Sequence, residues 1–197
     1  MALGLQRQPH ISGLALLATP WDFHQPNELR AKSLGAYAQS INSYLENTGK
    51  LPTDILQSMF VGMDPMLVMT KFSKFANYTM DSAKARHFVA IEDWLNDGVP
   101  LAANVTRDCL IGWYGDNKPV KGEWQVSGQT IDPAKFKIRT LALVPTGDKI
   151  VPLKSATALS NALPNAEVLH PPLGHIGMVV GNGARELVWQ KLADFFR

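Results

Sequence analysis

Two apolar runs in the last third of the chain predict neighbouring β-strands. IRTLALVPTGD (138–148) and AEVLHPPLGH (166–175) are each apolar at first and end in a glycine followed by a polar residue. Between them SATALSNAL (155–163) carries apolar residues at helical spacing and is followed by Pro164. Strand, helix and strand in this order predict a βαβ crossover, in which the two strands are parallel neighbours.

The residues that end these two runs are candidates for chemistry. Parallel neighbours place Asp148 and His175 on loops at the same, carboxyl, edge of the sheet, where open α/β sheets hold their functional groups. An aspartate after a strand is often a turn residue, and a lone histidine near a helix start is usually structural. An Asp and then a His at successive strand ends match the last two members of a nucleophile, Asp, His triad in α/β-hydrolase order.

A third strand and two terminal helices complete the predicted core. GLALLAT (13–19) is continuously apolar and predicts a strand buried on both faces. Residues 1–8 resemble the end of an amphipathic helix, and 183–196 predict a last helix capped by Asn182. We therefore expect an α/β fold of about three parallel strands with flanking helices, formed by 1–19 and 138–197.

The pattern between these parts, from residue 20 to 137, is mostly helical and predicts a large cap inserted over the carboxyl edge of the sheet. The expected helices cover 28–47 (ending at Gly49), 53–78 (broken near Asp64-Pro65), 81–96 (with Asp81 and Gly98 as its caps) and 101–114, and a hairpin turns at Ser127-Gly128.

Two side-chain types in the insertion leave alternatives open. The methionines at 59, 63, 66 and 69 suit either a channel for an acyl chain or ordinary packing of a helix pair. Trp21, Trp113 and Trp124 lie near the boundaries of the insertion and fit either substrate or partner contact or packing.

Composition narrows the class of protein. The 197 residues are 46% hydrophobic and 18% charged, which is ordinary for a soluble globular chain, and a net charge of +2 with scattered Lys and Arg points neither to nucleic acid nor to a membrane surface as a partner. No apolar stretch is long enough to span a bilayer. Cys109 is the single cysteine, so no internal disulfide forms, and its position on an apolar helical stripe favours packing over a nucleophilic role.

A triad needs a nucleophile on a glycine-flanked turn between a strand and a helix. The sequence contains no G-x-S-x-G or G-x-C-x-G, and in triad order such a turn would precede Gly13. We therefore expect a chain that carries the triad acid and base but no nucleophile.

Four blocks of sequence together resemble a known family. GLALLATPWDF, CLIGWYGDN followed by KGEWQVSGQTID, GDKIVP, and GHIGMVVG are similar to the carboxyl-terminal part of poly(3-hydroxyalkanoate) synthases, a branch of the α/β-hydrolase superfamily. The resemblance covers essentially the whole chain. It implies acyl transfer from (R)-3-hydroxyacyl-coenzyme A to a growing polyester, with Asp148 in GDKIVP as triad acid and His175 in GHIGM as triad base.

The same resemblance implies the rest of the functional expectation. No cofactor or metal is expected, a coenzyme A thioester is the expected substrate, and the expected location is the cytoplasm, with association to the polymer granule as a further option. A truncated relative without the nucleophile elbow is expected to be inactive alone. It would also leave strand 13–18 as an open edge, which predicts a partner chain or self-association.

Two other functions remain open. The same fold with a serine elbow would hydrolyse esters or thioesters, as an esterase, thioesterase or polyhydroxyalkanoate depolymerase does. Alternatively, the chain is a non-catalytic subunit that binds a synthase or the polymer granule.

Overall fold

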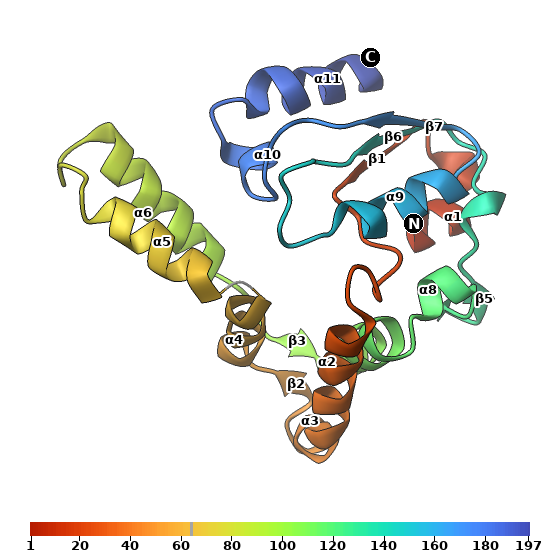
Figure 1. The fold of residues 1–197 in the computed structure, drawn as a ribbon. Coiled ribbons are helices and arrows are strands. Elements are labelled where there is room, and N and C mark those ends of the chain that lie inside the picture. The colour runs from red at the N-terminus through yellow and green to blue at the C-terminus, as the bar shows by residue number, and fades with distance from the viewer. Residues whose placement is uncertain (64) are drawn as a thin grey trace. The chain divides into compact units, whose positions relative to one another are not determined.

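The chain folds into two compact units, residues 1–39 with 108–197 and residues 40–107. We describe residues 1–63 and 65–197 of a computed structural model, leaving out the side chains of Phe60, Met63, Pro65 and Leu67 (Figure 1). The predicted division into a core (1–19 and 138–197) and a helical cap (20–137) stays a prediction.

The first unit is built on a parallel sheet of three strands in the order β1-β6-β7 (Figure 1). The strands are β1 Leu14–Leu17, β6 Thr140–Leu143 and β7 Ala166–Leu169, and α9 Leu153–Ala162 is the crossover helix between the last two. Leu141 pairs with Ala15 on one side and with Glu167 on the other. The predicted βαβ unit and the third parallel strand are confirmed.

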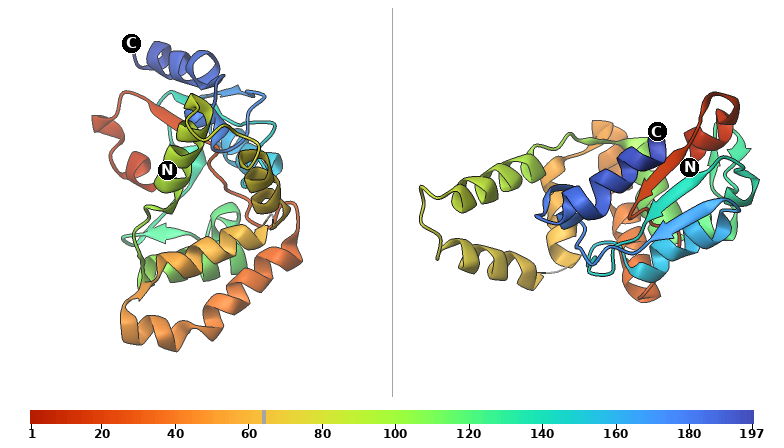
Figure 2. Two further views of the ribbon diagram at one scale, coloured as in Figure 1. Left: turned by 90° about the vertical axis from the view of Figure 1, so that its left-hand side faces the viewer. Right: turned by 90° about the horizontal axis from the view of Figure 1, so that it is seen from above.

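Helices cover the two faces of this sheet (Figure 2). Leu141 and Leu143 point to one face and pack in a core with Val188 and Leu192 of the carboxyl-terminal helices. Leu16 of β1 pairs with Ala142, which lies between Leu141 and Leu143, so its side chain points to the opposite face. There it packs in a second core with residues of α9 and of the segment around Phe136. All four residues of β6 are buried, whereas β1 is only half-buried apart from Leu16, because β1 is at the edge of the described sheet.

The remaining elements of the first unit are short or lead toward the second unit. They are α1 Ala2–Gln6, η1 Gln8–His10, α2 Glu28–Ser40, η2 Arg107–Gly115 (a π-helix), α8 Lys118–Lys121, β4 Gln125–Val126, β5 Gln129–Thr130, η3 Pro133–Lys135, α10 Gly177–Val180, η4 Arg185–Trp189 (a π-helix) and α11 Gln190–Phe196. Strands β4 and β5 pair across Ser127 and Gly128, both at positive φ, so the predicted hairpin is confirmed.

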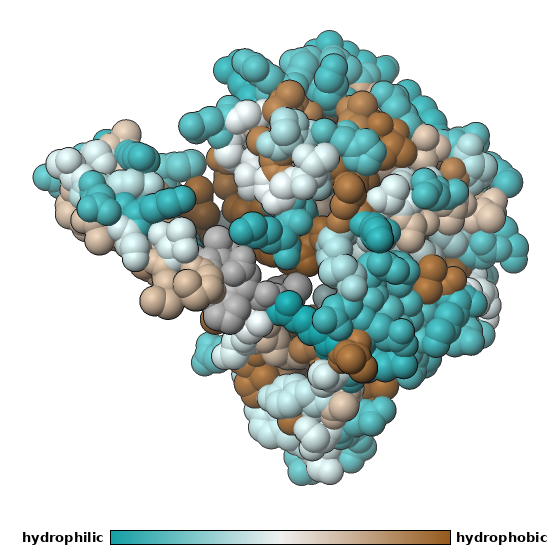
Figure 3. Space-filling model, in the orientation of Figure 1, coloured by the Kyte–Doolittle hydropathy of each residue, from teal (hydrophilic) through white to brown (hydrophobic). Residues whose placement is uncertain are grey.

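The second unit is helical apart from one short strand pair. Its elements are α3 Asn42–Thr48, β2 Lys50–Leu51, α4 Thr53–Met63, α5 Pro65–Phe75, α6 Ala83–Asn96, β3 Leu101–Ala102 and α7 Ala103–Thr106, with β2 antiparallel to β3. Helices α5 and α6 form a hairpin on whose surface hydrophilic and moderately hydrophobic residues are mixed (Figure 3).

Several predicted helix limits are wrong in detail. The predicted helix 28–47 is two helices that meet at Ile41, although its end before Gly49 is confirmed, because Gly49 adopts the left-handed conformation at φ 70°. Ser82, not Asp81, caps the amino end of α6, because the Ser82 side chain accepts a hydrogen bond from the backbone N–H of Ala85. The predicted break at Asp64 lies outside the described residues.

Three further expectations need correction. The segment 101–114 is not one α-helix, because it begins as β3 and continues as α7 and the π-helix η2. Gly98 does not cap α6, whose carboxyl cap is Asp97. Asn182 does not cap the last helix, which begins with η4 after Ala184.

Candidate functional site

The candidate site lies where β6 and β7 end. Asp148 follows β6 by five residues, and one oxygen of its carboxylate, Oδ1, accepts the backbone N–H groups of Ile150 (2.8 Å) and Val151 (2.9 Å). The loop Thr146 to Val151 thus folds back on the carboxylate before α9 begins, and the side chain has a single orientation. Its exposed fraction is 1%.

The second carboxylate oxygen of Asp148 faces the loop after β7. Nδ1 of His175 lies 2.7 Å from Oδ2 of Asp148. Because an ionised carboxylate only accepts hydrogen bonds, Nδ1 carries the proton and the neutral ring keeps a free electron pair on Nε2. The imidazole is 30% exposed, and no hydrogen bond joins Nε2 to a described residue, so Nε2 is the free end of the pair.

The electrostatics of Asp148 keep it ionised. Burial raises the pKa of this carboxyl group, but the hydrogen bond from His175 and those from the amides of Val151 and Ile150 lower it, and the net pKa is below its ordinary value. Asp148 is therefore a buried negative charge at neutral pH, suited to orient an imidazole and to stabilise its protonated form.

Backbone hydrogen bonds join the two loops that carry the pair. The backbone N–H of Thr146 donates a hydrogen bond to the carbonyl oxygen of Pro171 (3.1 Å), and that of Gly147 donates one to the carbonyl oxygen of Leu173 (3.1 Å). A Cβ added at Gly147 would lie 3.0 Å from the Leu173 carbonyl oxygen, so the glycine permits the close approach of the loops. Both members of the pair were predicted from the sequence, but the contact between Gly147 and Leu173 was not. The glycine before Asp148 is the one feature of the sequence that indicates it.

No nucleophile accompanies the pair. Among the described residues, no serine, threonine or cysteine side chain hydrogen-bonds to His175. Cys109 lies in η2 and is half-buried, and burial, with a smaller contribution from the charge of Asp108, raises the pKa of its thiol to about 11. The thiol is therefore protonated at neutral pH and a poor nucleophile.

The three flagged tryptophans pack on one another. The ring of Trp124 makes edge-on contacts with Trp21 at 5.9 Å and with Trp113 at 5.1 Å between ring centroids. Asn117 is buried, with φ at 56°. Its side chain accepts a hydrogen bond from the backbone N–H of Phe23 and donates one to Asp22, so it fixes the segment that follows Trp21. Asp22 and Asn117 lie within two of the blocks that resemble the synthase family, GLALLATPWDF and CLIGWYGDN, but the sequence pattern did not mark them as interacting residues.

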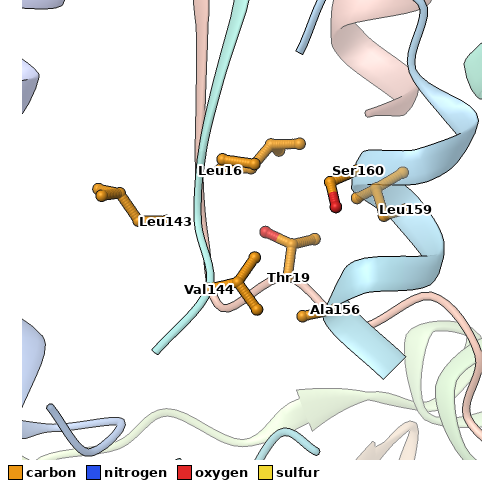
Figure 4. A pocket seen from close by; sticks show the side chains of 8 residues that line it. Leu16, Thr19, Leu143, Val144, Ala156, Leu159 and Ser160 are labelled. Carbon is orange, nitrogen blue, oxygen red and sulfur yellow. The ribbon is translucent and has the colours of Figure 1, made fainter. Parts of the chain in front are cut away.

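A cavity between the strands and α9 is too small for a substrate. Leu16, Thr19, Val144, Ala156 and Ser160 are among the residues around it, between the strands and α9 (Figure 4). Its volume is about 10 Å³, which is room for about one water molecule.

Comparison with solved structures identifies the fold. The putative non-heme bromoperoxidase BpoC of Mycobacterium tuberculosis matches 98% of this chain with 60% of its own, at a TM-score of 0.55 and 17% identity. A thermophilic esterase from Thermogutta terrifontis matches 99% of this chain with 59% of its own, at a TM-score of 0.53 and 15% identity. The protein has the α/β-hydrolase fold.

Comparison of sequences narrows the relationship. The poly(3-hydroxyalkanoate) polymerase subunit PhaC of Synechocystis is 31% identical over 186 residues, 90% of this chain and 49% of that protein. PhaC of Allochromatium vinosum is 26% identical over 183 residues, again 90% of this chain and 50% of the relative. The chain is related to PhaC polymerase subunits and spans about half their length. No family model matches it.

Proposed function

We propose that this chain supplies the acid–base half of an acyl-transfer site for (R)-3-hydroxyacyl thioesters. The observation that supports it is the 2.7 Å bond between Nδ1 of His175 and the buried carboxylate of Asp148, in a chain related to PhaC subunits. The nucleophile in this proposal is a cysteine on a polypeptide segment outside this sequence.

The chemistry of the proposal is as follows. Nε2 of His175 takes the proton of the cysteine thiol, and the thiolate attacks the thioester carbonyl, so that the acyl group passes to the cysteine. The leaving coenzyme A thiolate takes the proton back from the imidazolium, which Asp148 stabilises meanwhile. In the second half, Nε2 takes the proton of a hydroxyl at the end of the polyester, that oxygen attacks the acyl carbonyl and displaces the cysteine thiolate, and the thiolate takes the proton back from the imidazolium.

The first experiment uses the purified chain with (R)-3-hydroxybutyryl-coenzyme A, and measures released thiol and polymer. We expect neither above the level of the Cys109→Ala variant. Polymer formed by the chain and lost in Cys109→Ala would refute an external nucleophile.

The second experiment replaces the matching segment of Synechocystis PhaC by this chain. We expect polymer formation that falls at least ~10³-fold in His175→Gln and Asp148→Asn. His170→Gln is the matched control, because His170 also follows β7 but its Nδ1 lies 3.1 Å from the carbonyl of Val144 and not at the carboxylate. A folded chimaera that releases free 3-hydroxy acid and no polymer would show hydrolysis instead, and one without any acyl transfer would contradict the proposal.

A second candidate function is assembly without catalysis. It is supported by β1, which lies at the edge of the described sheet with one backbone side unpaired by any described strand. In this proposal β1 pairs with a strand of another chain. Sedimentation velocity would report concentration-dependent association, and a monomer at every concentration would count against strand pairing between copies.

A further inference from the structure

His175 leads into a helical turn that is too short to be stable by itself. The turn is α10, which has four residues and begins at Gly177. Isolated helices of fewer than about 12 residues are marginal in water, so contacts with the rest of the unit must hold α10 in place. Met178 supplies one such contact, because its side chain is 3% exposed and packs in the core with Leu141 and Leu143. This contact fixes the buried side of the turn.

A tryptophan of the last helical segment supplies a contact on the exposed side. Nε1 of Trp189 donates a hydrogen bond of 3.0 Å to the carbonyl oxygen of Val179. The last carbonyl groups of a helix have no partner within that helix, and the indole N–H satisfies one of them here. In Figure 1, α10 lies beside the start of the last helix. The bond therefore ties α10 to η4 across ten residues of sequence.

The bonded carbonyl belongs to the same turn as His175. Val179 is four residues after His175, and residues four apart in a helix lie one above the other on one side. The backbone between them is hydrogen-bonded, since the N–H of Met178 donates to Gly174 (2.9 Å) and the N–H of Val179 donates to Ile176 (3.0 Å). The turn therefore moves as one piece, and holding Val179 also holds the backbone of His175.

The segment that carries Trp189 has an unusual backbone. It is the π-helix η4, and π-turns are rare and frequently occur at functional sites. Val188 is 1% exposed and packs in the same core as Met178, whereas its neighbour Trp189 is 51% exposed. A half-exposed ring adds little to that core. The specific contribution of this position is the hydrogen bond to α10.

We propose that Trp189 is a positioning residue for His175. Its indole N–H holds the exposed side of the turn, and Met178 holds the buried side. With both sides held, Nδ1 of His175 stays at the carboxylate of Asp148 and Nε2 keeps one direction. The proposal rests on the proposed function for its effect on catalysis alone, because the state of the imidazole is measurable in the isolated chain.

The first test is nitrogen NMR of the histidine rings in the purified full chain, at a pH where they are neutral. A ring nitrogen that carries hydrogen differs in chemical shift from one that does not, so the spectrum reports the tautomer of each ring. The signal of His175 is assigned by its loss in His175→Gln. In the wild type we expect hydrogen on Nδ1 of His175.

The decisive variant is Trp189→Phe, which keeps an aromatic ring and lacks the N–H. We expect the share of His175 with hydrogen on Nε2 to rise about two- to tenfold, the factor that one neutral hydrogen bond contributes to an equilibrium. Trp189→Ala should have the same effect, because the N–H and not the ring is responsible. Trp94→Phe is the matched control, since Trp94 is similarly exposed (54%) but lies on α6 in the other unit, and should leave the signal unchanged.

The second test measures acyl transfer in the chimaera with Synechocystis PhaC. Trp189→Phe should lower kcat about two- to tenfold and leave KM nearly unchanged, because it misaligns the base and removes no contact to the substrate. A chimaera without acyl transfer would contradict the proposed function, and the NMR result would still decide the role of Trp189.

Three NMR results would overturn the positioning role. The first is a His175 signal in Trp189→Phe that equals the wild type, even if urea denaturation shows a loss of stability, because the bond would then serve folding alone. The second is an equal change in Trp94→Phe. The third is a change in Trp189→Ala that Trp189→Phe does not share, which would assign the effect to packing of the ring.

Discussion

Replacing Asp148 by alanine tests how the candidate site is held together. The substitution removes the acceptor of three hydrogen bonds, from the amides of Ile150 and Val151 and from Nδ1 of His175. A hydrogen bond to a charged group contributes about 1.5–3 kcal/mol, and a buried donor left without a partner costs about 1–3 kcal/mol. Because alanine leaves space in which water can bond to the freed donors, we expect a total loss of about 3–5 kcal/mol in the free energy of unfolding.

Urea denaturation followed by tryptophan fluorescence is the assay, since Trp21, Trp113, Trp124 and Trp189 all belong to the unit that contains Asp148. The control is Asp132→Ala, which removes a carboxylate that accepts one backbone amide at the start of η3. Its expected cost is about 1 kcal/mol, the usual value for a helix cap.

The pH dependence provides the refuting result. The pKa of Asp148 is lower in the folded than in the unfolded protein, so its stabilisation is fully present above the unfolded value of about 3.9 and is lost as the pH falls through the folded value. The difference between wild type and Asp148→Ala should therefore be largest near neutral pH and shrink below about pH 4. A cost no greater than that of Asp132→Ala at neutral pH, or a difference unchanged in acid, would refute the reasoning.

Three other substitutions or treatments have expected outcomes. Gly147→Ala should lower the free energy of unfolding by about 1–3 kcal/mol in urea denaturation, because its Cβ would press on the neighbouring loop, whereas Gly177→Ala adds a Cβ in open space and should not. Ser82→Ala should cost about 1 kcal/mol through loss of the α6 cap, and Asp81→Ala much less; equal costs would contradict the assigned cap. Cys109 should react slowly with a thiol reagent at neutral pH and rapidly in denaturant, and equal rates would contradict its raised pKa.

The parts of the fold that follow from strong local patterns were predictable. The apolar runs at 13–19 and 138–148 gave the right strands, and the crossover rule placed β6 and β7 as parallel neighbours. The same rule brought Asp148 and His175 to one edge, where they form a hydrogen bond. Their catalytic role stays a prediction.

The wrong predictions of helix caps and limits arise where two neighbouring residues satisfy the same local rule, or where contacts between distant segments determine the local structure. Asp81 and Ser82 are both good caps, and the sequence does not determine which of them faces the first free amide. Gly98 was explained by capping, but a Cβ there would lie 2.9 Å from the Cγ2 methyl of Thr53, so packing against α4 accounts for the glycine. The π-helix η2 has no periodic signal of its own, and Leu101 forms a strand because it pairs with Leu51.

The unequal exposure of the Asp148–His175 pair has a consequence for proton exchange. The hydrogen between Nδ1 and the carboxylate faces the buried Asp148 side chain, while the imidazole that carries it is 30% exposed. Isotope exchange of the Nδ1 hydrogen must then wait for its bond to the carboxylate to open, by rotation of the imidazole or by movement of the loops after β6 and β7. The lifetime of that one hydrogen therefore measures how often the Asp148–His175 bond opens.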